Sequence, residues 1–139
     1  MEPAPHILVV LAGIGQLLLC AASLAIPRVL RWEDDLRSVN PLTRQVFWVY
    51  AVYIWGTNLA FGLVSTFAAD ALLSGTPLAT SVCGFMGLYW LVRVAAQFCW
   101  FDMSSAPSGA HVKTASVLLS MLFIYLTVVY GWITLSAWF

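Results

Sequence analysis

Residues 87–97 read Gly87-Leu88-Tyr89-Trp90-Leu91-Val92-Arg93-Val94-Ala95-Ala96-Gln97, and one charged side chain stands in this otherwise apolar run. The run belongs to a longer apolar segment, about 79–101, which is long enough to cross a bilayer as a helix. An arginine near the centre of such a helix costs about 2.5 to 3.5 kcal/mol on insertion scales, so Arg93 requires a partner. The stretch therefore predicts a membrane-spanning helix with a polar site inside it.

The composition of the whole chain points to the same class of protein. Of its 139 residues, 62% are hydrophobic and only 9% are charged, whereas about 25% of the residues of a soluble domain are charged. Apolar segments recur at about 7–26, 46–69, 79–101 and 114–138. We expect an all-α membrane protein in which residues 1–139 form a single integral membrane domain, a bundle of four transmembrane helices.

Prolines and capping residues predict where these helices begin and end. Pro27 is expected to close the first helix at about Ile26, because proline cannot continue the hydrogen-bond ladder. Asn40-Pro41 and Thr76-Pro77 each combine a capping side chain with a proline in the first helical turn, so helices should begin at Pro41 and Pro77. Residues 102–111 hold proline, glycine and small polar residues and are expected to form a loop.

The segment 28–38, between the first two spans, differs from its apolar neighbours. Val29, Trp32 and Leu36 recur at i, i+3 and i+7 among charged residues, which is the pattern of a short amphipathic helix on the membrane surface. A pair between Glu33 and Arg37 at i, i+4 would stabilise such a helix.

The positive charges predict the orientation in the membrane, because Lys and Arg near the ends of spans are retained on the cytoplasmic side. The basic residues outside the spans all lie in the first and third loops: Arg28, Arg31, Arg37, Arg44 and Lys113. We therefore expect a multi-pass protein of the cell (inner) membrane, surrounded by membrane lipids, with both termini non-cytoplasmic.

Six basic and six acidic residues balance, so no basic surface indicates a nucleic-acid partner.

The candidate ligand site is centred on Arg93. Trp90 and Gln97 lie close to the same helical face, and Tyr53 and Tyr50 of the second span lie at a similar depth in the cytoplasmic half. A contact from Arg93 to the Tyr53 hydroxyl, or to a neighbouring ring, is expected.

The spans hold no acidic residue at their interior, so the counter-charge for Arg93 must come from elsewhere. The candidates are Glu33, Asp34, Asp35 and Asp102, a lipid phosphate or another bound anion. Two interpretations remain open. Arg93 is either a structural residue that tethers the surface helix and fixes the register of the bundle, or a site for the anionic headgroup of a lipid or phosphorylated isoprenoid.

The other polar residues indicate structure rather than chemistry. Gln16 and Asn58, near the middle of their spans, are expected to hydrogen-bond between helices. Three consecutive residues of a helix point in different directions, so Glu33-Asp34-Asp35 does not form a metal site. His6 and His111 are expected on opposite sides of the membrane, where they cannot share one haem. No catalytic residue, metal site or cofactor is predicted.

Two functions from different classes remain. The preferred one is a non-enzymatic subunit, assembly factor or scaffold of a larger membrane complex, with other membrane protein subunits or a second copy of the chain as partners. The short loops and aromatic surfaces favour it. The alternative is a small membrane enzyme or carrier that binds an anionic lipid or phosphorylated isoprenoid in a cavity around Arg93, open to the cytoplasmic leaflet.

Overall fold

Four long helices account for most of the protein. The computed structural model describes residues 2–102, 104 and 107–139, which are helical with short connections and contain no strand. The long helices are α1 (Pro3–Ser23), α4 (Pro41–Phe67), α6 (Pro77–Cys99) and α7 (Ala110–Ser136). Each is long and apolar enough to cross a membrane, as the recurring apolar segments predict.

Two helix starts follow the predicted capping residues. α4 begins at Pro41, and the side chain of Asn40 accepts a hydrogen bond of 2.9 Å from the backbone N–H of Leu42. α6 begins at Pro77, and the Thr76 hydroxyl accepts one of 3.2 Å from the N–H of Ala79. Each cap satisfies a backbone donor that the helix itself leaves unpaired.

The predicted end of the first helix is wrong by about one turn. α1 ends at Ser23 rather than at Ile26. In a continuous helix the Pro27 ring would clash with the carbonyl four residues earlier, which belongs to Ser23, so the regular ladder stops there. Pro27 instead lies in the first turn of the short helix α2 (Ile26–Val29).

The single amphipathic helix expected over 28–38 is replaced by three short elements: α2, α3 (Trp32–Asp35) and the 3-10 helix η1 (Leu36–Ser38). The break falls at Arg31, which has φ 55° and ψ 41°. This left-handed conformation costs a non-glycine residue about 1–2 kcal/mol, and it turns the chain between α2 and α3. We name α2, α3 and η1 together the connecting segment.

The break also changes the ion pairs of the connecting segment. The predicted pair between Glu33 and Arg37 is not present. Asp34 instead pairs with Arg31 at 3.8 Å and with Arg37 at 3.5 Å. One carboxylate therefore pairs with two guanidinium groups and balances only one of their two positive charges.

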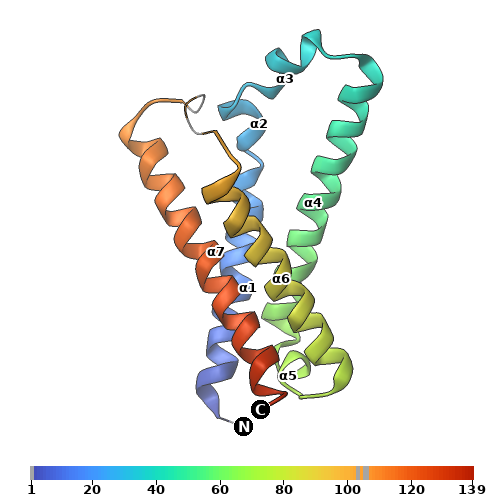
Figure 1. Ribbon diagram of the computed structural model, residues 1–139, viewed down its shortest axis with the longest axis vertical. Helices are drawn as coiled ribbons and strands as arrows, with labels where there is room; N and C mark the ends of the chain where they lie inside the picture. The colour runs from blue at the N-terminus through green and yellow to red at the C-terminus, as the bar shows by residue number, and fades with distance from the viewer. Residues whose placement is uncertain (1, 103, 105–106) are drawn as a thin grey trace.

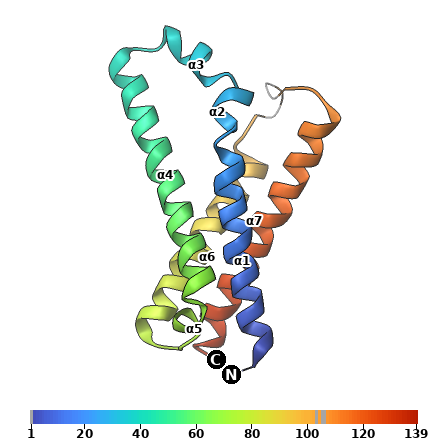
Figure 2. The same ribbon diagram turned by 180° about the vertical axis from the view of Figure 1, so that it is seen from behind.

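The long helices are arranged as two hairpins, in which α1 packs on α4 and α6 packs on α7. α1 also contacts α7 and lies between α4 and α7 when the molecule is seen from behind (Figure 2). The two termini lie together at one end of the bundle, where the short helix α5 (Ala69–Leu72) packs against α6 (Figure 1). Toward the connecting segment, α4 and α7 diverge (Figure 1). The bundle is therefore closed at the end with the termini and spread at the other.

Two glycines bring the helices of each hairpin close together. A Cβ on Gly13 would lie 2.6 Å from the backbone nitrogen of Thr66, and one on Gly87 would lie 3.2 Å from that of Gly131. Small residues at such crossings let helix backbones approach closely, which is the usual way that helices pack inside a membrane.

The loop between α6 and α7 lies at the spread end. Met103, Ser105 and Ala106 of the predicted 102–111 loop fall outside the described residues. Hydrogen bonds from Ser104, including one of 2.9 Å from its backbone N–H, lower the pKa of the Asp102 carboxyl.

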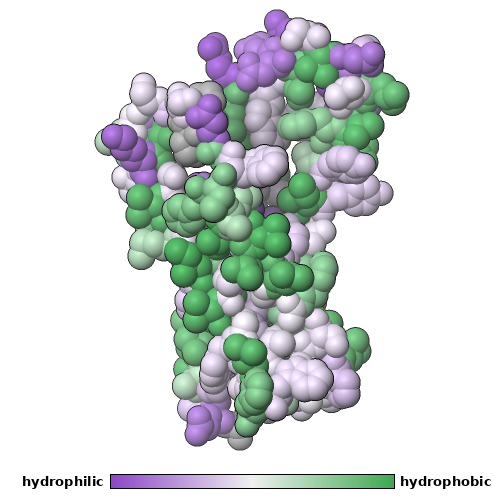
Figure 3. All heavy atoms as spheres, in the orientation of Figure 1, coloured by the Kyte–Doolittle hydropathy of each residue, from purple (hydrophilic) through white to green (hydrophobic). Residues whose placement is uncertain are grey.

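The hydrophilic residues on the face shown in Figure 3 gather mainly at the two ends of the molecule, with apolar residues between them.

Candidate functional site

A buried hydrogen-bonded network joins all four long helices. The amide of Gln16 on α1 donates to the hydroxyl of Tyr130 on α7 at 2.6 Å, and its oxygen accepts from the indole N–H of Trp90 on α6 at 3.2 Å. The Tyr130 hydroxyl also bonds with the Ser65 hydroxyl on α4 at 2.5 Å. Gln16, Ser65 and Tyr130 are 0% exposed, and Trp90 is 1% exposed. We call these four residues the core network.

The donors and acceptors of the core network fit one another. An indole N–H can only donate, so Trp90 fixes the amide oxygen of Gln16 as its acceptor and turns the amide nitrogen toward Tyr130. That nitrogen also donates to the backbone carbonyl of Ala12 at 3.2 Å. Within the described part of the chain, no buried side-chain nitrogen or oxygen lacks a partner. The polar groups of the core are therefore occupied by one another.

Only part of this network could be found from the sequence. Gln16 makes the interhelical bonds expected of a mid-span amide, and Asn58 likewise accepts from the Tyr89 hydroxyl at 2.8 Å. No sequence pattern singles out Ser65 and Tyr130, because serine and tyrosine are common in apolar helices and the bonded positions are 65 or more residues apart. Trp90, which the sequence pattern places in the candidate ligand site, belongs to the core network.

The Arg93 guanidinium lies between aromatic rings. Its carbon is 4.6 Å from the centre of the Phe123 ring and 5.0 Å from that of Phe101, and one of its nitrogens donates to Gln97 at 3.0 Å. Phe123 in turn stacks on Trp90, with ring centres 5.4 Å apart and an interplanar angle of 15°. Cation–π contacts stabilise a charge without a carboxylate.

Among the residues that the structure describes, no ion pair joins Arg93 to an acidic side chain. The ion pairs among the described residues join His6 to Asp70, and Asp34 to Arg31 and Arg37. The acidic residues of the connecting segment therefore do not reach Arg93. The guanidinium instead lies over the rings of Phe101, which follows the end of α6, and of Phe123, which lies on α7. No local sequence pattern relates Phe123 to Arg93.

The two tyrosines predicted to lie near Arg93 point elsewhere. Tyr50 is 63% exposed and Tyr53 is 70% exposed on α4. α4 packs on α1, whereas the helix partner of α6 is α7. The expected contact between Arg93 and Tyr53 is consequently not formed, because α4 diverges from the bundle at this depth.

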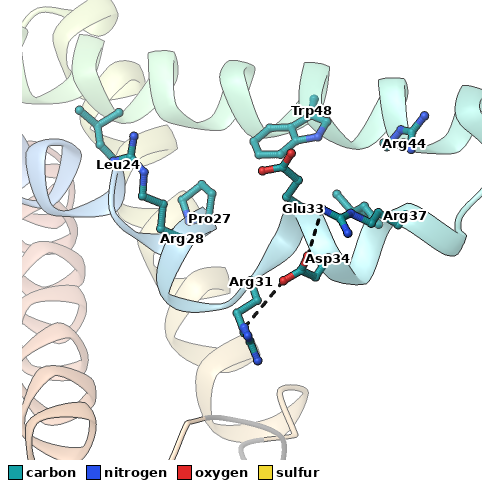
Figure 4. A pocket seen from close by; sticks show the side chains of 10 residues that line it. Leu24, Pro27, Arg28, Arg31, Glu33, Asp34, Arg37, Arg44 and Trp48 are labelled. Atoms are coloured by element: carbon teal, nitrogen blue, oxygen red, sulfur yellow. Dashed lines mark ion pairs between the residues drawn. The ribbon is translucent and has the colours of Figure 1, made fainter.

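A pocket lies between the connecting segment and α4, and Arg93 is not among its lining residues. Its volume is about 930 Å³. The lining residues are Leu24, Pro27, Arg28, Arg31, Glu33, Asp34, Leu36, Arg37, Arg44 and Trp48 (Figure 4). From the sequence alone, the arginines among them indicate only the orientation in the membrane, because no sequence pattern predicts the break at Arg31 beside the pocket.

A second pocket, of about 380 Å³, lies between the end of α6 and the start of α7 and is lined by Gln97 but not by Arg93. Its other lining residues are Phe98, Ser116, Val117, Ser120, Met121 and Ile124. Within the described ranges, no three His, Cys, Asp or Glu side chains come together as metal ligands.

Comparisons with known proteins give no relative to guide the assignment. No protein-family model, curated protein or solved structure matches the chain.

We predict that Tyr130→Phe destabilises the protein by about 1–3 kcal/mol, because it leaves Ser65 and the Gln16 amide with unpaired buried polar atoms. In the double variant with Ser65→Ala, one of these orphaned groups is removed, so the two changes should cost less together than their sum. Unfolding in mixed micelles measures all three variants. Strictly additive costs would show that the two hydroxyls do not interact.

For Arg93 we predict a coupling of about 0.5–2 kcal/mol with Phe123, the range of cation–π contacts. The changes Arg93→Met and Phe123→Leu, made singly and together, give this coupling from the same unfolding measurement. Lys113→Met combined with Phe123→Leu is the control and should show none. A coupling of zero for the Arg93 pair would mean that the ring does not stabilise the charge.

Proposed function

We propose that the chain is a four-span integral membrane protein with a non-enzymatic role, acting as a subunit, assembly factor or scaffold of a larger membrane complex. The core network supports this proposal, since its polar side chains hold the helices together and satisfy one another's hydrogen bonds. The observation that carries it, however, is the exposure of α4.

α4 is packed much less than the other long helices. α1 buries six residues, and α6 and α7 bury five each. The 27 residues of α4 bury only Gly62 and Ser65, both in its last two turns. The first half of this helix buries no residue, and most of its exposed side chains are apolar, although it is one of the two longest helices described.

The outer side of α4 has the chemistry of a helix–helix contact. Tyr53, Gly56 and Ala60 recur at i, i+3 and i+7 and so lie on one face. A Cβ on Gly56 would meet no atom within 4 Å. Hydrophobicity does not drive helices together in lipid, and small residues favour contact by letting backbones approach. Tyrosine hydroxyls beside them can donate hydrogen bonds to a partner helix. We call Tyr53, Gly56 and Ala60 the α4 face.

The alternative, a lipid or isoprenoid enzyme or carrier with its cavity at Arg93, has less support. Phe101 and Phe123 cover the guanidinium, and neither of the two pockets described above is lined by Arg93. We therefore propose a structural role for Arg93, in which it fixes the end of α6 against α7.

The proposed placement is the cell (inner) membrane with both termini non-cytoplasmic. The termini lie at one end of the bundle, and the connecting segment, which carries three of the five basic residues outside the spans, lies at the other (Figure 1). A cysteine introduced beside Lys113 tests this orientation. It should react with an impermeant thiol reagent only in inverted membranes, and reaction in intact cells would contradict the proposal.

For docking through the α4 face we predict that Gly56→Leu releases the protein from its complex. The wild-type chain should migrate in a mild detergent as part of a larger assembly, and the variant should migrate as the free protomer with unchanged thermal stability. Gly131→Leu is the matched control, since its Cβ likewise meets no atom within 4 Å, and it should leave the assembly intact. Migration of the wild-type chain as a free protomer would refute the proposed role.

A further inference from the structure

The pocket beneath the connecting segment carries an excess of positive charge. Four arginines and two carboxylates line it, which leaves a net charge of +2. Asp34 neutralises part of the charge of Arg31 and Arg37. Among the described ion pairs none involves Arg28 or Arg44, so these two guanidinium groups lack a carboxylate partner.

The pocket is also apolar on part of its wall. Leu24, Pro27, Leu36 and Trp48 line it together with the arginines. In Figure 4, Arg28 extends from α2 toward α4, Arg44 lies on α4, and Glu33 points toward Trp48. A ligand that fits this lining has an anionic head and an apolar body.

An aromatic cluster holds the pocket in shape. Trp32 of α3 packs edge-to-face on Phe47 and Trp48 of α4, with ring centres 5.0 and 5.9 Å apart. Phe47 and Trp48 also pack edge-to-face on each other, at 5.9 Å. These contacts fix α3 to α4, so the pocket does not depend on the exposed ion pairs to keep its walls in place.

We propose that this pocket binds an anionic phospholipid, whose headgroup is attracted by Arg28 at one side of the pocket and by Arg44 at the other (Figure 4), with an acyl chain along Leu24 and Trp48. Guanidinium groups match the geometry of phosphate oxygens and bind them through paired hydrogen bonds. The volume of about 930 Å³ lies within the usual range for small-molecule sites. This inference rests on the proposed membrane placement, which brings the pocket to the cytoplasmic leaflet where anionic lipids attract basic side chains, and it is independent of docking through the α4 face.

The test is lipid binding to the purified full-length chain in a neutral detergent, followed by native mass spectrometry. The probes are dioleoyl phosphatidylglycerol, dioleoyl phosphatidylcholine with the same chains, and water-soluble glycerol 3-phosphate. Phosphatidylglycerol should bind more tightly than phosphatidylcholine. Arg28→Gln and Arg44→Gln should each weaken its binding about fivefold, and together about 25-fold, as expected for single basic residues near an anionic headgroup.

Three further variants make the result specific to the pocket. Lys113→Gln removes a basic residue at the same end of the bundle but outside the pocket, and it should leave binding unchanged. Asp34→Asn releases Arg31 and Arg37 from their ion pairs and should tighten binding, so the proposal remains testable even if an arginine variant fails to fold. Gly56→Leu should not affect lipid binding, which separates this proposal from the one on docking.

Three results would overturn the proposal. Equal affinity for phosphatidylglycerol and phosphatidylcholine would show that the arginines do not distinguish an anionic headgroup from a neutral one. If Lys113→Gln lowered the affinity for phosphatidylglycerol as much as the pocket variants do, the effect would come from the general surface charge and not from the pocket. Competition by glycerol 3-phosphate at the affinity of the lipid would assign the site to a free phosphate ester instead.

Discussion

The structure depends on the hydrogen bonds that Gln16 makes at the centre of the bundle. An amide in an apolar interior loses its water and must find partners in the protein, or the cost reaches several kcal/mol. Gln16 finds them on α6 and α7, and Tyr130 extends the chain to Ser65 on α4. Apolar packing in lipid is compatible with many helix registers, whereas this network is satisfied in one. It therefore selects the depth at which the four helices meet.

Because the core network joins all four helices at one depth only, the two ends of the bundle differ in how closely the helices pack. Below it, toward the termini, the helices are held by Gly13 against Thr66 and by α5 against α6. Above it, Trp90 leads through Phe123 to Arg93, and this aromatic column holds only α6 against α7. α4 is joined to α6 by the hydrogen bond from Tyr89 to Asn58, and it diverges from the bundle toward the connecting segment (Figure 1). The exposed surface of α4 and the pocket beneath the connecting segment are both results of this divergence, and they are the two features for which we propose partners.

The features predicted correctly are those determined by neighbouring residues. A cap next to a proline fixes the starts of α4 and α6 whatever the rest of the chain does, and hydrophobic length fixes the number of long helices. Arg31 shows the limit of this reasoning, because an arginine in the left-handed region looks like any other residue of an amphipathic pattern. Arg93 shows another. Its charge was the correct signal of a polar contact inside the bundle, but its partners are two phenylalanine rings and Gln97, and the rings are brought to it by tertiary packing. Ser65 and Tyr130 depend on packing in the same way, since each acquires its role only from residues on other helices.

The most direct test of the central claim is hydrogen exchange at the side chains of the core network, measured by NMR on the protein in lipid bilayers. The account predicts that the indole proton of Trp90 and the amide protons of Gln16 are protected from exchange with D₂O, with contacts from the Gln16 amide to the Tyr130 ring. Rapid exchange at Gln16 and Trp90, in a protein whose backbone amides on α1 and α6 remain protected, would show that water reaches these groups and that the network does not hold the helices together.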